Sequence, residues 1–242
     1  MASEQRPGDD DADDRAVSLV DRVYRNTRRA IVEGAYGPGT PLRLHQLARE
    51  NDVSLIPVRE ALRMLEVERL VESTPMKGAR VAPISAADVG DAYGVRLVLE
   101  PEAVRLAFPN LTDDDLKRGR ALNTEMLRRL RRRDEAAFDV HRSLHFTIYE
   151  ASGSPWLLHF IRIAWDATER YRRIATSVRA SPEEIAHEHA MVFDAIEQGD
   201  LAAAQHALRD HLEHTARILV DLCEAGQGRD LAGPPPTRHA AQ

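Results

Sequence analysis

The sequence predicts a mainly α-helical protein with a small N-terminal domain and a larger, all-helical C-terminal domain. Apolar residues follow helical spacing over most of the chain, short elements and a Gly-containing turn crowd into residues 41–81, and Gly or Pro breaks separate the long helical segments that follow. The expected divisions are an acidic disordered tail (1–14), a first domain (15–84), a helical domain (85–226) and a second disordered tail (227–242).

The composition is that of a soluble protein with room for a sizeable core. The chain has 242 residues, of which 43% are hydrophobic and 30% charged. No run of about eighteen apolar residues predicts a membrane span, and the acidic N-terminus lacks the apolar region of a secretory signal. Cys223 is the single cysteine, which excludes an intrachain disulfide and suits a cytoplasmic protein.

The charge distribution favours nucleic-acid binding by the first domain, although the net charge is −6. Residues 15–80 hold 12 Lys or Arg against 8 Asp or Glu, whereas residues 1–14 hold one Arg against six acids. A local positive surplus is what attraction to phosphate requires.

Short elements of the first domain follow one another in the order of a winged helix-turn-helix. A helix is expected over residues 16–31, followed by a Gly- and Pro-rich loop. Two short helices are expected at 44–51 and 55–66, then a further helical stretch ending near Val71, and a hairpin at Lys77-Gly78. In such a domain the second short helix enters the major groove of DNA.

The second short helix has one apolar and one polar face. Ser54 can cap it, and Pro57 lies in its first turn, where the missing N–H costs nothing. Val58, Ala61, Leu62 and Leu65 form the apolar face, and the residues expected to project outward are Leu55, Ile56, Arg59, Glu60 and Arg63. An outward Arg can read guanine. The alternative is a small helical domain whose Arg residues are merely solvated.

Long amphipathic helices are expected from residue 86 to about Cys223, with Ser85 as the first N-cap. The breaks between them fall at Pro109-Asn110, Gly153-Ser154-Pro155, Ser181-Pro182 and Gly199-Asp200. This spacing predicts a bundle of about six or seven helices.

Four of the ten histidines have the placement of metal ligands. His141 and His145 share one helix face, and His189 and His211 lie 22 residues apart, on helices expected to be antiparallel around Gly199-Asp200. Imidazole suits Zn, Ni, Cu or Fe. The alternative is that the histidines are ordinary helix residues and bind no metal.

The segments VSLIPVREALRMLEVERLVE and IVEGAYGPGTPL resemble the helix-turn-helix region of the GntR family of regulators. The resemblance implies that Ser54, Arg59, Lys77 and Gly78 contact DNA. Where the family often has Arg, Thr and Arg, this chain has Leu55, Ile56 and His45, and Asp52 replaces the usual Gly of the turn. We therefore expect altered operator preference, with Leu55 and Ile56 able to touch thymine methyl groups.

The second half of the chain resembles the FCD ligand-binding domain, which is the all-helical C-terminal half of FadR-type regulators. The matching segments, in the order of that domain, are RLVLEPEAV, the histidine helix, EHAMVFDAIEQGD and RDHL. The resemblance implies a divalent metal held by Asp-x3-His and two later histidines. His145, His189 and His211 match those histidines, and His141 stands at the Asp position. The all-nitrogen set favours Zn or Ni over Mn or Mg. His187 and His214 do not match the family positions.

Arg96 and Glu100 lie four residues apart on the first helix of the bundle and can form a solvated surface pair. In the family that the chain resembles, an Arg here lines the effector cavity. Because a guanidinium holds a carboxylate through two hydrogen bonds, Arg96 is the candidate effector anchor.

These patterns favour a homodimeric transcriptional regulator, acting as a repressor, that binds a palindromic operator in double-stranded DNA. A small carboxylate effector and a divalent metal are expected to modulate it. The alternative is a helical metal-dependent hydrolase or isomerase using the histidines. No general base stands at a fixed spacing from them, because Glu150 lies off the face of His145.

Overall fold

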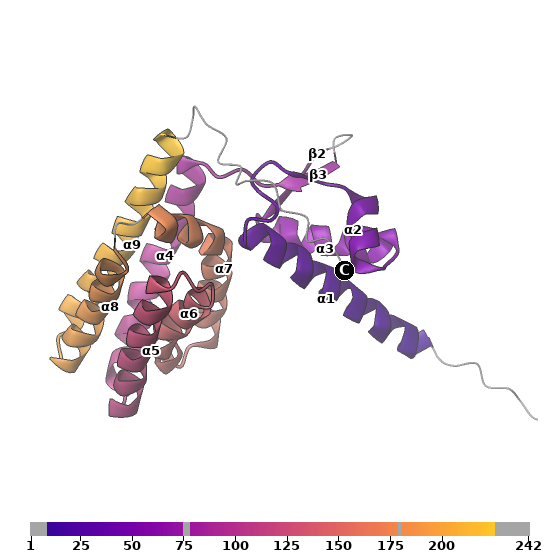
Figure 1. The fold of residues 1–242 in the computed structure, drawn as a ribbon. Helices are drawn as coiled ribbons and strands as arrows, with labels where there is room; N and C mark the ends of the chain where they lie inside the picture. The colour runs from indigo at the N-terminus through magenta and orange to yellow at the C-terminus, as the bar shows by residue number, and fades with distance from the viewer. Residues whose placement is uncertain (1–8, 75–77, 179–180, 226–242) are drawn as a thin grey trace, which may run out of the picture. The chain divides into compact units, whose positions relative to one another are not determined.

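The computed structural model describes residues 9–74, 78–178 and 181–225. The chain divides into two compact units between Ile84 and Ser85. The first unit is mixed helix and strand, and the second is helical (Figure 1).

Helix α1 (Asp9–Val32) begins inside the segment expected to be a disordered tail. The helix therefore overlaps residues 9–14 of that segment. The tail expected at 227–242 and the wing residue Lys77 lie outside the described residues.

The helix-turn-helix consists of α2 (Leu44–Asn51) and α3 (Leu55–Val67), as predicted. Asp52 lies between them in the left-handed region, at φ 51° and ψ 56°, and its N–H bonds to the carbonyls of Ala48 and Arg49. An Asp in place of Gly therefore sustains a turn of positive φ, at some conformational cost.

The further helical stretch expected to end near Val71 is wrong. Helix α3 ends at Val67, Arg69 has φ 57°, and strand β2 (Val71–Thr74) begins two residues later. The left-handed residue turns the chain out of the helix, so that Leu70 and Val71 are buried in the core of this unit.

A three-stranded antiparallel sheet completes the first unit. Strand β3 (Gly78–Val81) lies between β1 (Pro41–Leu42) and β2. In the β2–β3 hairpin Val71 pairs with Val81 and Thr74 with Gly78, which has φ +80°. This hairpin is the predicted wing.

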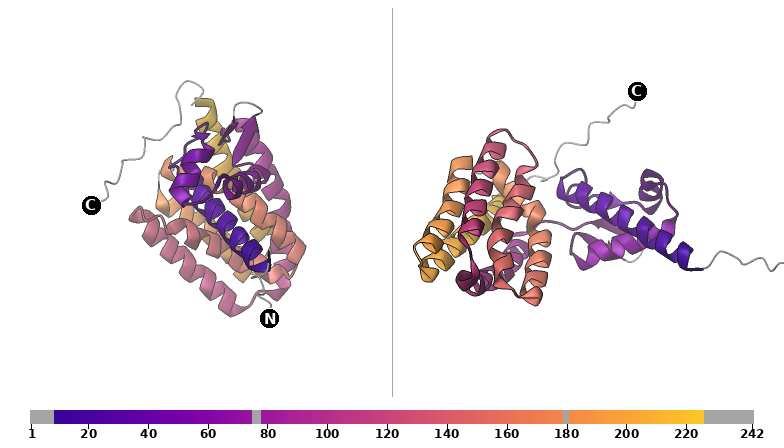
Figure 2. Two further views of the ribbon diagram at one scale, coloured as in Figure 1. Left: turned by 90° about the vertical axis from the view of Figure 1, so that its right-hand side faces the viewer. Right: turned by 90° about the horizontal axis from the view of Figure 1, so that it is seen from below.

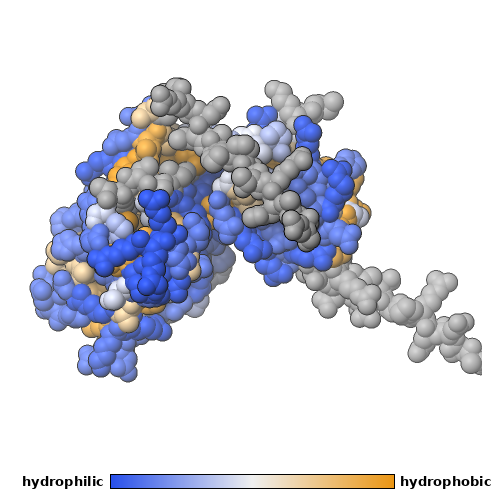
Figure 3. All heavy atoms as spheres, viewed as in Figure 1, coloured by the Kyte–Doolittle hydropathy of each residue, from blue (hydrophilic) through white to orange (hydrophobic). Residues whose placement is uncertain are grey.

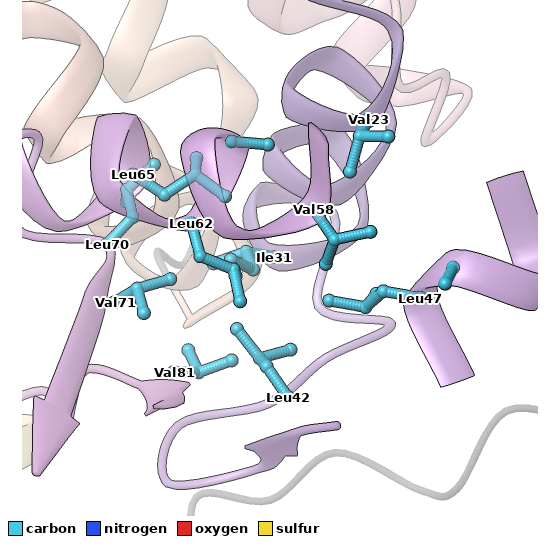
Figure 4. Packing of buried hydrophobic residues seen from close by; sticks show 12 residues of the cluster. Val23, Ile31, Leu42, Leu47, Val58, Leu62, Leu65, Leu70, Val71 and Val81 are labelled. Carbon is cyan, nitrogen blue, oxygen red and sulfur yellow. The ribbon is translucent and has the colours of Figure 1, made fainter. Parts of the chain in front are cut away.

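The core of the first unit is apolar. The side chains of α1, α2, α3 and the strands converge on one cluster (Figure 4), whose members include Val23, Ile31, Leu42, Leu47, Val58, Leu62, Leu65, Leu70, Val71 and Val81. Helix α1 packs mainly on α3, so the two helices form the framework of the unit.

Six α-helices make up the described part of the second unit, and they run alongside one another (Figures 1 and 2). They are α4 (Ala86–Ala107), α5 (Asp113–Arg131), α6 (Ala137–Tyr149), α7 (Pro155–Val178), α8 (Pro182–Glu197) and α9 (Leu201–Ala225). Short 3-10 turns follow α4 (Phe108–Asn110) and α6 (Glu150–Ser152). All four predicted breaks separate elements of this bundle.

Capping residues explain where several of these helices begin. Ser85 accepts a hydrogen bond from the Asp88 N–H, as expected, and Thr112 and Asp115 form a capping box. The Ser181 side chain, which precedes α8, accepts hydrogen bonds from the backbone N–H groups of Glu183 and Glu184 in the first turn of that helix.

Helices α5 and α8 approach closely at Gly119. A Cβ atom there would collide with the ring of the buried Phe193, so the contact depends on a residue without a side chain. Further contacts join α4 to α7 and α9, α5 to α6, and α8 to α9.

Most of the surface visible in Figure 3 is hydrophilic on both units. Among the described residues, no helix combines the length and the apolar character needed to cross a membrane.

Candidate functional site

Helix α3 has the two faces that the sequence predicts. Val58, Ala61, Leu62 and Leu65 are buried in the first unit. Ile56 is 72% exposed. Arg59, Glu60 and Arg63 are also exposed. The exposed side of α3 therefore offers cationic and apolar groups together.

Two details of α3 differ from expectation. Ser54 occupies the N-cap position with extended backbone angles, but its side chain makes no capping hydrogen bond. Leu55 does not project freely, because it is partly buried and packs against the core. The first turn thus gains stability from apolar packing, and Ile56 is the more accessible of the two aliphatic candidates.

Other residues predicted to contact DNA lie on α2 and the hairpin. His45 is exposed on α2, and Gly78 is exposed at the start of β3. Arg63 forms an ion pair with Glu60 at 2.7 Å, so it must exchange that partner to reach phosphate.

The structure brings together all four predicted histidines of the second unit. Their ligand atoms lie within 4.8 Å of one another. The Nε2 atom of His145 lies 3.0 Å from that of His141 and 2.9 Å from that of His189, and the His141–His189 distance is also 3.0 Å. His145, His189 and His211 are buried and His141 is half-buried, on α6, α8 and α9.

Hydrogen bonds at the opposite side of the rings define which nitrogens carry protons. The Nδ1 of His189 lies 2.6 Å from the carbonyl oxygen of Ile185, which only accepts. The Nδ1 of His211 lies 2.7 Å from a carboxylate oxygen of Glu188. Both rings therefore donate through Nδ1, and in the neutral form each leaves an Nε2 lone pair.

Burial favours the neutral form of His141 and His145. It lowers the pKa of His141 and of His145 well below the usual histidine value, and the neighbouring imidazoles lower both further. Converging lone pairs repel one another unless a proton or a cation lies between them. The donor set therefore fits a divalent metal, which neutral imidazole nitrogens bind.

Glu188 extends the cluster toward solvent. Its carboxylate receives His211 at 2.7 Å and His214 at 2.6 Å. Together with Glu184, the pair of Glu188 and His214 forms a second, more exposed group of possible ligands. His214 therefore lies next to the histidine cluster but outside it.

Arg96 is not on a solvated surface. Its side chain is 1% exposed and that of Glu100 is 0% exposed, and the two form a bidentate pair with N···O distances of 2.5 and 3.2 Å. The alternative of a surface pair is wrong, because α7 covers this face of α4: Arg96 stacks over Trp165 and lies 3.4 Å from Thr168.

A cavity joins Arg96 to the histidines. With a volume of about 30 Å³ available to the centre of a water molecule, it holds roughly two waters. Its wall includes Tyr93, Arg96, His141, Arg172 and His211. An anion entering this cavity would meet two guanidinium groups and the histidine cluster.

The sequence reasoning missed three side chains of this centre: the buried Arg172 and Tyr149, and the half-buried Glu188. Arg172 lines the cavity and stacks 4.0 Å from the centroid of Trp165. Tyr149 follows His145 by four residues, and Glu188 directly precedes His189. The i,i+4 spacing was a visible signal for Tyr149.

Known protein families match both units. The gntR family of bacterial regulatory proteins matches residues 19–81, and the FCD domain matches residues 91–214, just over half of the chain. These matches coincide with the helix-turn-helix and with the bundle that holds the histidines.

Curated relatives are similar over most of their length. The transcriptional regulator BphR of Paraburkholderia xenovorans (strain LB400) is 28% identical over 213 residues, covering 84% of this chain and 85% of that protein. The transcriptional repressor RspR of Escherichia coli (strain K12) is 26% identical over 200 residues, covering 79% and 85%.

Solved structures share the fold. E. coli McbR/YncC aligns with a TM-score of 0.70 at 24% identity, covering 84% of this chain and 97% of that one. A GntR regulator from Rhodococcus sp. RHA1 aligns with a TM-score of 0.68 at 22% identity, covering 84% and 98%.

The families and relatives are those of DNA-binding transcriptional regulators, which speaks against the alternative of a hydrolase or isomerase. Regulators of this family bind DNA and respond to small-molecule effectors. This chain belongs to the GntR family of bacterial regulatory proteins and carries an FCD domain.

Proposed function

We propose that this regulator is a repressor that binds a palindromic operator as a homodimer and is released by a small carboxylate bound next to a divalent metal. The observation that carries the DNA-binding surface is the division of α3, which buries Val58 and Leu65 and exposes Arg59 and Ile56. The α3 helix enters the major groove in this proposal, with His45 and Gly78 at its flanks. Lys77, which lies outside the described residues, stays a proposed contact from the sequence alone.

Gel-shift titration against the DNA upstream of its own gene tests the operator proposal. We expect binding that is selective for sequence and weakens steeply with salt. Arg131→Ala is the matched control for changes at Arg59 and Arg63, because Arg131 is an exposed Arg of the second unit. Equal affinity for the upstream region and for scrambled DNA contradicts the proposal.

The proposed dimer uses adjacent helices of the bundle. Val95 and Val98 are exposed on α4, and Trp156, Phe160 and Ile163 are exposed on α7, which packs against α4. Large exposed apolar groups on neighbouring helices are typical of an interface between protein chains.

Sedimentation velocity tests this interface. Trp156→Glu, which places a charge at a 74% exposed apolar position, is expected to shift the protein toward monomer. Met191→Glu on α8 is the control, because Met191 is also exposed and apolar but lies on neither helix. A monomeric wild-type protein at micromolar concentration rules the dimer out.

The proposed metal is held by His141, His145, His189 and His211. Bound Zn²⁺ or Ni²⁺ would supply a positive charge and open positions for a carboxylate. The Nε2 atoms of His141, His145 and His189 lie 2.9–3.0 Å apart, which is close enough for the three rings to share one ion. Neutral imidazole nitrogens suit both Zn²⁺ and Ni²⁺.

Elemental analysis of the purified protein tests the metal proposal. We expect about one equivalent of metal in the wild-type protein and a large loss in His189→Ala. His187→Ala is the control, because it changes a neighbouring histidine of α8 that lies outside the cluster. Metal-free wild-type protein that also takes up neither ion on dialysis contradicts the proposal.

The proposed effector binds between the metal and the arginines of the cavity. Glu100 already occupies two nitrogens of Arg96, so a carboxylate must share that guanidinium or turn to Arg172. Burial lowers the pKa of Arg172, and Arg96 lowers it further. Arg172 is paired with Glu169, so a carboxylate that turns to Arg172 must share its guanidinium with that side chain.

A thermal-shift screen of small carboxylates, with and without EDTA, tests the effector proposal. We expect the stabilising compounds to weaken operator binding by roughly 5- to 150-fold, the usual range of allosteric coupling. Stabilisation should disappear with EDTA and in Arg172→Met. A carboxylate that strengthens operator binding indicates that the protein is not an effector-released repressor.

A further inference from the structure

A chain of buried hydrogen bonds connects the histidine cluster to the arginine of the cavity. The Nδ1 of His145 lies 2.9 Å from the Tyr149 hydroxyl, which donates to Glu100 Oε2 at 2.6 Å. The other oxygen of Glu100 accepts from Arg96 Nε at 2.5 Å. All four side chains are buried, so water does not compete for these bonds.

The direction of each hydrogen bond follows from the chemistry of its groups. Arg96 has only donors and the Glu100 carboxylate has only acceptors. The hydroxyl of Tyr149 therefore gives its proton to Glu100, and its oxygen is left to accept from His145. This arrangement requires the proton of His145 to lie on Nδ1, which turns the Nε2 lone pair toward His141 and His189.

We propose that Tyr149, oriented by Glu100, is a positioning residue that fixes the tautomer and ring orientation of His145 for metal binding. This inference rests on the proposed metal centre. The second ring N–H of a metal-bound histidine usually donates to a carboxylate or a backbone carbonyl. In this proposal the Tyr149 hydroxyl accepts that hydrogen bond from His145. Because Glu100 also holds Arg96, the chain ends at the cavity proposed for the effector.

The other ligands are oriented differently. His189 is held by a backbone carbonyl, that of Ile185, and His211 by the carboxylate of Glu188. Of His145, His189 and His211, only His145 is therefore oriented by a tyrosine hydroxyl. Removing the hydroxyl oxygen of Tyr149 tests this role.

Tyr149→Phe keeps the buried ring and removes the hydroxyl. We expect its affinity for Ni²⁺ and Zn²⁺, measured on the full chain by competition with a chelating dye, to fall about 10- to 100-fold. The matched control is Tyr171→Phe, which removes a hydroxyl bonded to Asp88 in the same bundle. We expect the metal affinity of that variant to equal that of wild type.

A second measurement reads the tautomer directly. In metal-free protein labelled with ¹⁵N-histidine, the imidazole shifts of wild-type His145 should show a proton on Nδ1. Tyr149→Phe should show a mixture of tautomers, and Tyr171→Phe the wild-type form. The wild-type spectrum keeps the inference testable even where Tyr149→Phe unfolds.

The possible outcomes distinguish the positioning role of Tyr149 from the existence of the metal centre. Wild-type protein that binds metal, with an equal affinity in Tyr149→Phe, overturns the positioning role alone. A wild-type His145 protonated on Nε2 also overturns it. Wild-type protein that binds neither ion overturns both the metal centre and the role of Tyr149 in it.

Discussion

The two units of this regulator both have apolar cores, but they differ in the polar side chains that they bury. The cluster at the centre of the first unit is aliphatic, whereas His45, Ile56 and Arg59, which are proposed to contact DNA, lie at its surface. The second unit buries an ion pair and three histidines at its centre. Stability and function are therefore separable by mutation in the first unit, whereas in the second they share the same residues.

The largest effect is expected from breaking the buried ion pair. Glu100→Leu leaves Arg96 buried without its partner, which should lower the free energy of unfolding by about 3–5 kcal/mol. Urea unfolding measures this change. Glu102→Ala, which removes an exposed partner of Arg105, is the control and should have no measurable effect.

A large-to-small change in the aliphatic core is expected to cost slightly less. Leu65 is fully buried in the first unit, and Leu65→Ala should destabilise that unit by about 2–5 kcal/mol. Urea unfolding should show this loss with metal affinity unchanged. A parallel loss of metal affinity means that the two units do not separate in the way their cores suggest.

Arg59→Ala should lower the affinity for the operator and leave the stability of the fold unchanged. Loss of a bidentate contact to guanine costs about 1–3 kcal/mol of binding free energy, or roughly 5- to 150-fold in operator affinity. Because Arg59 is exposed, the unfolding midpoint should stay the same. A shift assay and a urea titration of the same preparation check both parts, and an unchanged affinity removes Arg59 from the interface.

Acid should destabilise the second unit more than the first. The folded-state pKa values of His141 and His145 lie well below 6.5, so the unfolded state binds more protons as the pH falls through that value. The contribution of the two histidines to the free energy of unfolding is fully present above pH 6.5. It decreases as the pH is lowered from 6.5, by up to about 1.4 kcal/mol per pH unit for each histidine. Urea unfolding in EDTA at pH 7.5 and 5.5 checks the sign of this change in the free energy of unfolding. The loss at pH 5.5 should be smaller in His141→Asn than in wild type.

The smallest effect is expected at the turn of the helix-turn-helix. Asp52→Gly should stabilise the first unit by less than about 1 kcal/mol, because Gly adopts the positive φ of 51° without steric cost. Arg133→Gly, at φ 54° in the second unit, should act in the same direction. A loss of stability in both variants contradicts this account of the two turns, and thermal unfolding is sensitive enough to detect it.

Local patterns predicted the elements well. The bounds of α2 and α3 and the breaks of the bundle depend on apolar spacing, Gly and Pro, all of which act within a few residues. The helix expected up to Val71 failed for the complementary reason. The sequence around Arg69 permits a helix, and the strand pairing of Val71 with Val81 overrides it.

The sequence predicted the four histidines of the candidate site but not the residues that orient them. The sequence spacing of the four histidines indicates that they can meet, but the partners that orient them come from elsewhere in the fold. Glu100 reaches Tyr149 across 49 residues, and helix α7 buries Arg96 from 72 residues away. Such contacts follow from tertiary packing, which periodicity does not encode.

The C-terminal end of α3 has a consequence for the dynamics of the first unit. Glu68 follows the last helical residue, and its carboxylate accepts hydrogen bonds from Tyr24 and Arg28 of α1. Helix α3 is therefore tied to α1 at this end, and fraying of this end breaks both hydrogen bonds. Amide hydrogens near Glu68 should exchange with solvent only when the whole unit opens, so α1 and α3 form one cooperative folding unit.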